Sequence, residues 1–219
     1  MTKIAFISKK EDAGCAAALS FLQANFSEVT PFLSGAAWGG RMPAGLREWR
    51  GDYIVSYLGR WILPREVLSN ASKGAINFHP ASPDYPGLGS VNFALYEEAK
   101  TFGATCHIME PKVDSGRIIA VKRFPVFPSD TVESLLSRTY THQLALFYEV
   151  LSLLALGRDL PGTTEQWTRE PFTRSDFNRL FIVTRDMPDN EIARRIRALE
   201  YKNWGPYLEL CGRRFALEL

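Results

Sequence analysis

Cysteine and histidine are scarce in this chain of 219 residues, which contains three of each. The cysteines Cys15, Cys106 and Cys211 are odd in number and widely spaced, so a disulfide framework is not expected. This usage favours reduced thiols in a cytoplasmic protein. The histidines are scattered, and no Cys/His cluster has the spacing of zinc ligands. We therefore expect no metal site.

Long apolar runs and an excess of one charge are also missing. No apolar run approaches the about 20 residues that a membrane-spanning helix requires. The first residues, Met1-Thr2-Lys3-Ile4, are expected to begin a strand rather than a signal peptide. A formal net charge of +2 is too small to argue for binding to nucleic acid or to a membrane. The composition, 46% hydrophobic and 23% charged, is that of a globular protein.

Strands and helices are expected to alternate over the first hundred residues. Apolar runs predict strands at 3–8, 28–33, 53–57 and 75–78. Helical spacing of apolar residues and a proline at a first helical turn predict helices at 13–25, 64–70 and 90–99. This order predicts an α/β fold with a Rossmann-like, mostly parallel sheet, right-handed crossovers and helices on its faces.

The second half of the chain predicts a hairpin, a long helix and an extension. Segments 104–110 and 117–126 are expected to pair around a turn that holds Asp114 near the strand ends. An apolar stripe along helix 130–156 is typical of core packing. Glycine and proline then interrupt the pattern. We therefore expect a catalytic domain over residues 1–157 and a small C-terminal extension, residues 158–219, packed on it.

An amide, an imidazole and a carboxylate are the candidate chemical groups. Asn77 and His79 are two residues apart on a predicted strand, so their side chains project from the same face. A Pro-rich loop follows, and Asp114 comes later in the predicted hairpin turn. A donor, a titratable base and a carboxylate would equip a site for acyl transfer. A solvated or capped Asn-x-His pair is the plainer reading, and composition alone leaves both open.

Four sequence blocks resemble the folate-dependent formyltransferases over roughly residues 53–126. In order, the blocks are Asn77-Phe78-His79-Pro80 with Pro86-Gly87, Ala94-Leu95-Tyr96-Glu97, Gly103-Ala104-Thr105-Cys106-His107 and Lys112-Val113-Asp114-Ser115-Gly116. Four blocks in the right order are a specific signal. The resemblance implies an enzyme that moves a formyl group from N10-formyltetrahydrofolate to an amine.

The same resemblance implies roles for the three candidate residues. Asn77 would donate to the oxygen that becomes negatively charged as the amine attacks the formyl carbon. His79 would accept the proton of the amine, and Asp114 would orient or charge-balance the imidazole. His107 is a rival base, because it alternates with Thr105 on its strand and could face either the site or the core.

The resemblance also places the folate donor. The expected residues are Tyr57, Leu58, Gly59, Arg60, Trp61, Ile62, Leu63, Met109, Glu110 and Val113. Apolar side chains in this set would line a slot for the pterin ring, and Gly59 would let the backbone approach it. Trp61 replaces what is often a smaller residue in the family. The alternative is a plain loop with a hydrophobic staple into helix 64–70.

The class of acceptor is inferred from sequence differences between the members of the family that use different acceptors. Glycinamide-ribonucleotide enzymes carry a glycine-rich phosphate loop after the first strand, whereas Lys9–Cys15 contains a single glycine. Methionyl-tRNA enzymes usually have Ser-Leu-Leu-Pro after His-Pro, where this chain has Ala81-Ser82-Pro83-Asp84. The loop 80–87 and the tail 192–219 look most like sugar-nucleotide N-formyltransferases, whose products enter surface polysaccharides. The residues expected at the acceptor are Lys9, Lys10, Tyr85, Pro86 and Gly87.

Other functions stay open at this point. The acceptor could be another small amine or glycinamide ribonucleotide, or the enzyme could hydrolyse the formyl donor to formate. A non-catalytic homologue that senses folate or nucleotide is a further alternative, although binding alone would not require the amide, imidazole and carboxylate together. Helix 130–156 or a C-terminal hairpin could form a homodimer interface.

Overall fold

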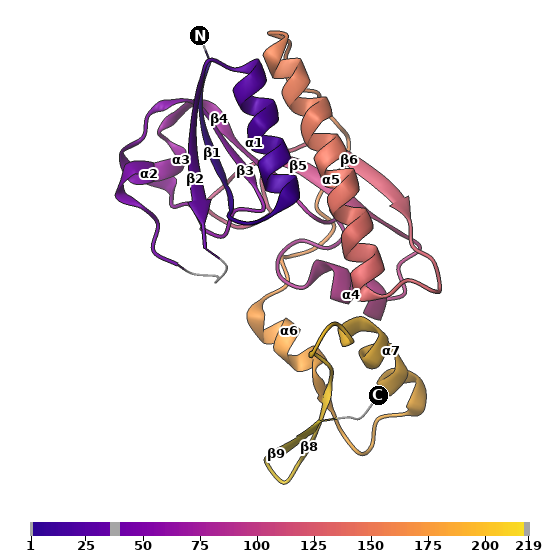
Figure 1. The fold of residues 1–219 in the computed structure, drawn as a ribbon. Coiled ribbons are helices and arrows are strands. Elements are labelled where there is room, and N and C mark those ends of the chain that lie inside the picture. Colours follow the sequence, from indigo (N-terminus) through magenta and orange to yellow (C-terminus); the bar gives the residue numbers. More distant parts are fainter. Residues whose placement is uncertain (1, 36–39, 217–219) are drawn as a thin grey trace.

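The computed structural model describes residues 2–35 and 40–216, and its centre is a six-stranded sheet (Figure 1). The strands are β1 (Lys3–Lys9), β2 (Glu28–Ser34), β3 (Gly51–Tyr57), β4 (Ala71–His79), β5 (Thr101–Ile108) and β6 (Ile118–Pro125), in the spatial order β2-β1-β3-β4-β5-β6. The first four strands run parallel, whereas β5 is antiparallel to β4 and β6 is antiparallel to β5. The expected mostly parallel α/β sheet is therefore confirmed.

Helices cover both faces of this sheet. Helices α1 (Ala13–Asn25) and α5 (Val132–Ala155) lie side by side on one face, while α2 (Ala44–Glu48) and α3 (Arg65–Leu68) pack on the other (Figure 1). The alternation along β1 explains this, because Ile4 and Phe6 point into the first core cluster and Ala5 and Ile7 into the second. Among the described residues, no helix is both long and apolar enough to cross a membrane.

The apolar stripe of α5 is core packing, as expected. The ring of Phe147 lies 4.9 Å from that of Phe78 and 5.4 Å from that of Tyr57, centre to centre. Such aromatic contacts contribute about 0.5–1.5 kcal/mol each beyond their buried area. The helix begins at a capping box in which Thr131 and Ser134 exchange hydrogen bonds, which satisfies backbone donors that would otherwise be unpaired. Together, cap and stripe fix α5 against the strands that carry the candidate site.

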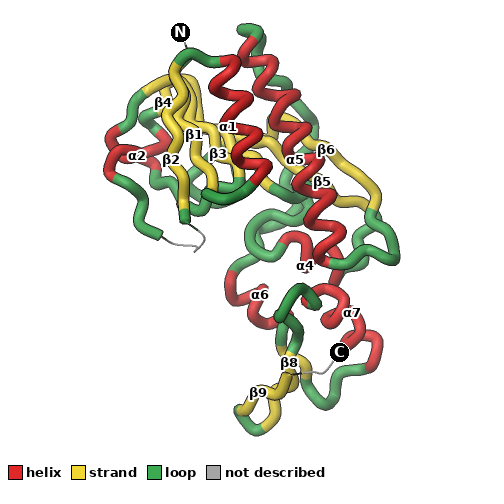
Figure 2. Tube along the Cα trace, viewed as in Figure 1, coloured by secondary structure: helices red, strands yellow, loops and turns green. Residues whose placement is uncertain are grey.

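The C-terminal part is a smaller unit beside α4 (Ser90–Tyr96), separate from the main sheet (Figure 2). It contains α6 (Arg174–Leu180), β7 (Ile182–Val183), α7 (Asp189–Leu199), β8 (Tyr207–Leu210) and β9 (Arg213–Ala216), and the strands form a sheet in the order β7-β8-β9. The side chain of Asn92 donates to the carbonyl of Ala198 at 2.7 Å, which ties α4 to α7. The boundary at residue 157 stays a prediction.

Several elements differ in their bounds from the sequence-based expectation: the helix expected at 90–99 ends at Tyr96, and the strand expected at 104–110 is Thr101–Ile108. The helix predicted over residues 64–70 ends at Leu68, and the strand predicted over 75–78 begins already at Ala71. The early start follows from pairing, since Ala71 aligns with Gly51 of β3. The apolar periodicity of one segment gives no information about the strand with which that segment pairs.

Candidate active site

The strand β4 delivers two of the three candidate side chains to the carboxyl edge of the sheet. Asn77 and His79 lie on one face at its end, as alternation requires. Between them, the carbonyl of Phe78 accepts a hydrogen bond of 2.6 Å from the buried side chain of Gln143 on α5. This bond anchors the last residues of the strand to the longest helix.

Asp114 lies in the turn between β5 and β6, as the predicted hairpin requires. Its φ of +44° is in the left-handed region, which aspartate tolerates better than most residues. One carboxylate oxygen lies 3.2 Å from Nδ1 of His79 and accepts the backbone N–H of Gly87 at 2.8 Å. The other oxygen lies 3.3 Å from Nε2 of His107. The structure therefore gathers the three predicted residues and adds a second histidine.

His107 faces the site, which the sequence left open between site and core. The antiparallel register of β4 and β5 places it directly opposite Asn77, and its Nε2 lies 3.1 Å from the Asn77 amide nitrogen. Its Nδ1 donates to the carbonyl of Ile108 at 2.8 Å. In the neutral ring, Nε2 therefore accepts from Asn77. In the charged ring, Nε2 donates to Asp114 and the amide of Asn77 must turn.

The imidazole of His79 is held between two acceptors. Nδ1 faces the carboxylate of Asp114, and Nε2 lies 3.0 Å from the carbonyl of Tyr85. A doubly protonated ring satisfies both partners. For His79 to accept a proton, Nε2 must first release its own proton and exchange the Tyr85 carbonyl for a substrate amine.

The Asp114 carboxyl is a permanent negative charge at neutral pH. Burial raises its pKa, but the charge of His79, the hydrogen bond from His107 and the N–H of Gly87 outweigh burial and lower it to about 2. Its exposed fraction is 6%, and those of His79 and His107 are 6% and 2%. An ionised carboxylate in this setting orients imidazoles and stabilises their charge, and it does not act as a proton donor.

The sequence comparison decides the family. Residues 34–151 match the formyl transferase family, which is more than half of the chain. The chain belongs to the formyl transferase family. The matched range contains β3 to β6 and most of α5, and hence every residue of the Asp114 network.

Solved structures show the same fold for this formyltransferase. A sugar N-formyltransferase from a Shewanella species superposes with a TM-score of 0.78 at 22% identity, covering 100% of this chain and 97% of that one. A 4-N formyltransferase from Francisella tularensis gives 0.77 at 16% identity, with 100% and 98% covered. The N-formyltransferase from Helicobacter canadensis, in complex with folinic acid and dTDP-3-aminofucose, gives 0.74 at 17% identity, with 98% and 86% covered.

Two of the residues expected to line the formyl donor are part of the core instead. The side chain of Tyr57 is 1% exposed and packs against Phe78 and Phe147, and Leu63 is buried in the cluster under α2 and α3. Neither side chain presents a surface to a ligand, because the apolar run of β3 continues through residue 57. A contact between these two residues and the donor stays a prediction. Leu58 follows at the strand end with a φ of +54°.

The other expected donor residues are distributed around the edge. Ile62 is 71% exposed and Val113 is 41% exposed, so both offer apolar surface to a ligand. Gly59 is required by packing, since a Cβ there would lie 2.8 Å from a methyl carbon of Ile7. Arg60, Trp61, Met109 and Glu110 lie in the same two segments, with Trp61 and Met109 partly buried against the cluster under α2 and α3.

The loop expected to touch the acceptor is mostly internal. The Tyr85 ring is buried against Phe102, and burial raises the pKa of its hydroxyl to about 12. Pro86 is buried as well. The loop folds inward and presents backbone groups, the Tyr85 carbonyl and the Gly87 N–H, to the histidine and the carboxylate. A contact between Tyr85 or Pro86 and the acceptor stays a prediction.

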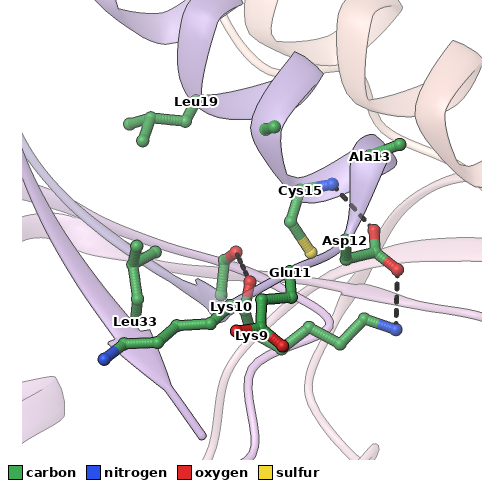
Figure 3. Close-up of a pocket in the computed structure, with 10 residues that line it drawn as sticks. Lys9, Lys10, Glu11, Asp12, Ala13, Cys15, Leu19 and Leu33 are labelled. Atoms are coloured by element: carbon green, nitrogen blue, oxygen red, sulfur yellow. Dashed lines mark hydrogen bonds and ion pairs between the residues drawn. The ribbon is translucent and has the colours of Figure 1, made fainter. Parts of the chain in front are cut away.

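Lys9 and Lys10 line a cavity of about 310 Å³ at the carboxyl end of β1 (Figure 3). The cavity is bounded by the residues Ser8 to Ala13 and by the start of α1, and none of Asn77, His79 and Asp114 lines it. The ammonium group of Lys9 lies 2.8 Å from Asp12, which also caps α1 by accepting the N–H of Cys15. An anion bound here would compete with the Asp12 carboxylate for the Lys9 ammonium group and the Cys15 N–H. Contact between Lys9 or Lys10 and an acceptor stays a prediction.

Proposed function

We propose that this protein transfers the formyl group of N10-formyltetrahydrofolate to the amino group of a nucleotide-linked amino sugar. One observation carries the proposal: an amide, two imidazoles and an ionised carboxylate converge at the carboxyl edge of a formyl transferase sheet. The fold shared with sugar N-formyltransferases, one of them in complex with folinic acid and dTDP-3-aminofucose, supports this choice of donor and acceptor.

The edge of the sheet suits a folate donor. Ile62 and Val113 present exposed apolar side chains on the two segments where the donor is expected. Ring-shaped ligands bind to such apolar walls and are oriented by a few polar groups. Met109, Glu110 and the backbone of residues 58–60 lie in the same segments and would orient the donor, which supplies the formyl group.

Within this site, Asn77 is the proposed donor to the formyl oxygen. Its amide nitrogen already lies 3.1 Å from His107, which fixes the plane of the amide. An amide has two N–H groups, so one remains for an oxygen that gains negative charge as the amine attacks. A donor that interacts more strongly with the transition state than with the ground state lowers the barrier, typically by about 3–4 kcal/mol.

His79 is the proposed acceptor of the amine proton. Nε2 becomes available as a base once it has released its proton and an amine takes the place of the Tyr85 carbonyl, while Nδ1–H stays against Asp114. The buried carboxylate then stabilises the imidazolium that forms. We place the reaction in the cytoplasm and the product among the precursors of surface polysaccharides.

The test is a transfer assay with the formyl donor and a panel of dTDP-, GDP- and UDP-linked amino sugars. Mass spectrometry of each acceptor should show a gain of one formyl group, lost in the Asn77→Ala and His79→Ala variants. Consumption of the donor with formate as the only product would instead identify a hydrolase. Formylation of glycinamide ribonucleotide or another small amine, with every sugar unchanged, would refute the acceptor class.

A further inference from the structure

A tryptophan from the C-terminal part of the chain touches both histidines. The indole of Trp167 meets the ring of His79 at a centroid distance of 6.0 Å and an interplanar angle of 64°. It meets the ring of His107 at 5.1 Å and 86°. Its Nε1–H donates to the carbonyl of Gly116 at 2.7 Å, which fixes the indole relative to the turn that holds Asp114. Trp167 lies outside the range matched to the family.

We propose that Trp167 is a positioning residue that holds both imidazole rings on Asp114 and keeps water away from the formyl carbon. This inference rests on the proposed function, since water competes with the amine for the same formyl group. A flipped imidazole presents carbon where nitrogen is needed. Edge-to-face packing against a fixed indole opposes that flip in both rings at once.

The segment that carries Trp167 is fastened to the loop beside the site. We call residues 163–172 the strap. The backbone N–H of Phe172 donates to the carbonyl of Pro86 at 2.9 Å, and that of Leu88 returns a bond to Phe172 at 3.0 Å. Gly87 makes this approach feasible, because a Cβ there would lie 2.5 Å from the carbonyl oxygen of Phe172. Gly87, whose backbone N–H donates to Asp114, is therefore also the residue against which the strap packs.

Two ion pairs fasten the rest of the strap. Arg123 of β6 donates to both oxygens of Glu165, at 2.9 and 2.8 Å, and also to Asp84 at 2.7 Å. Arg169 donates to both oxygens of Glu97, at 2.7 and 3.0 Å, and its guanidinium covers the ring of Tyr85 at 5.3 Å. Paired bonds of this kind fix geometry as well as distance. Trp167 lies between these two anchor points.

The chemistry gives this position a consequence that can be measured. In transfer, the amine nitrogen bonds to the formyl carbon, the bond between that carbon and N10 breaks, and the proton lost by the amine is balanced by one gained at N10. In hydrolysis the same bond breaks, water supplies the second oxygen of formate, one proton of the water goes to N10 and the other is released. Both reactions use the same histidines, so exclusion of water favours transfer over hydrolysis.

The experiment measures formate released per formyl group transferred in the full-length enzyme, for Trp167→Phe and Trp167→Ala. The matched controls are Trp204→Phe and Trp204→Ala, because Trp204 is exposed and lies in the C-terminal unit beside Phe181. We expect Trp167→Ala to lower kcat about 10- to 100-fold and to raise the formate ratio, with KM changed far less. Trp167→Phe, which keeps a ring but loses the bond to Gly116, should lie between.

A residue that only stabilises the fold would lower transfer and hydrolysis by the same factor. An unchanged formate ratio in Trp167→Ala, with a normal thermal melting curve, would therefore overturn the inference. A second readout needs no substrate: ¹⁵N chemical shifts report the tautomers of His79 and His107, with His142 as the internal reference. Shifts that are the same in Trp167→Ala and wild type would also overturn it. If wild-type enzyme transfers nothing, the proposed function fails, and the ¹⁵N result still decides the positioning role.

Discussion

Two buried aspartates show how similar geometry can serve different ends. Asp114 accepts the backbone N–H of Gly87 and faces two imidazoles. Asp130, before α5, accepts the backbone N–H of Phe127 at 2.7 Å, the hydroxyl of Ser134 and the guanidinium of Arg138. Each carboxylate is 6% exposed, and the pKa of each is lowered because these partners outweigh the effect of burial.

The difference lies in what the partners can do. A guanidinium does not release its proton in a protein, so the pair of Asp130 and Arg138 is a fixed link that stabilises the start of a helix. Imidazoles exchange protons at neutral pH, so the partners of Asp114 can move charge during a reaction. Burial and a depressed pKa therefore do not identify an active site by themselves. The titratable partners and the position at the carboxyl edge of the sheet do.

Replacing Asp114 by Asn should have the largest effect. The side chain keeps its shape but loses the charge that holds two imidazoles, so we expect transfer to fall about 10²- to 10⁴-fold. Steady-state rates with donor and acceptor saturating would measure this. Asp130→Asn is the matched control and should keep the wild-type kcat per folded molecule. Equal losses of rate in the two variants would show that both carboxylates serve only the fold.

Gly87→Ala tests the backbone donor of the same network. Alanine at a φ of +87° is strained, and its Cβ would lie 2.5 Å from the carbonyl oxygen of Phe172. We expect a loss of about 3 kcal/mol in the free energy of unfolding, measured by urea denaturation. Gly162→Ala is the control, since a Cβ there has no atom within 4 Å. A Gly87→Ala variant as stable as this control would contradict the close approach of the strap.

How much of this could be predicted from the sequence depends on the range of each contact. The placement of Asn77 and His79 follows from alternation on one strand, and that of Asp114 from a local hairpin, so short patterns suffice. The position of His107 depends on the antiparallel register between β4 and β5. The sequence shows a histidine two residues after Thr105, but it does not show which face of the sheet that side chain occupies. No local pattern gives the direction or the register of a neighbouring strand.

Trp167 was not predicted at all, for the same physical reason. It reaches the site through a strap held by hydrogen bonds and ion pairs to residues that are distant in sequence, such as Arg123 and Pro86. The side chain of Tyr57 shows the same limit for the core. Its place at the end of an apolar run was compatible with a ligand wall and with the core, and contact with Phe147 on a distant helix decided for the core.

Asp130→Asn should act on stability where Asp114→Asn acts on rate. Removing the charge weakens a charge-assisted link to Arg138 and the cap of α5, so the free energy of unfolding should fall by about 2 kcal/mol. Urea denaturation at neutral pH would measure it. Arg138→Lys keeps the charge but not the planar group whose nitrogen also donates to the carbonyl of Pro125, and should lose less. An unchanged free energy of unfolding in both variants would show that the pair of Asp130 and Arg138 orients the two side chains without stabilising the fold.

The last expected effect is the pH dependence of the stability that Asp114 contributes. The pKa of Asp114 is about 2 in the folded protein and about 3.9 in an unfolded chain, so folding favours its ionised form. The stabilisation, about 2 kcal/mol, is complete above pH about 4 and is lost as the pH falls through about 2. Other carboxylates with lowered pKa values also make the free energy of unfolding fall at low pH. The contribution of Asp114 is therefore measured as the difference between wild type and a variant that lacks its carboxylate.

Unfolding free energies of wild type and Asp114→Asn, measured from pH 6 to pH 2, isolate this contribution. Their difference should shrink with falling pH, because the wild-type carboxylate becomes protonated while the amide of the variant does not change. A difference that stays constant would mean that Asp114 is not stabilised as an anion. In that case the imidazoles would lack the fixed negative charge on which both the proposed transfer and the comparison with Asp130 depend.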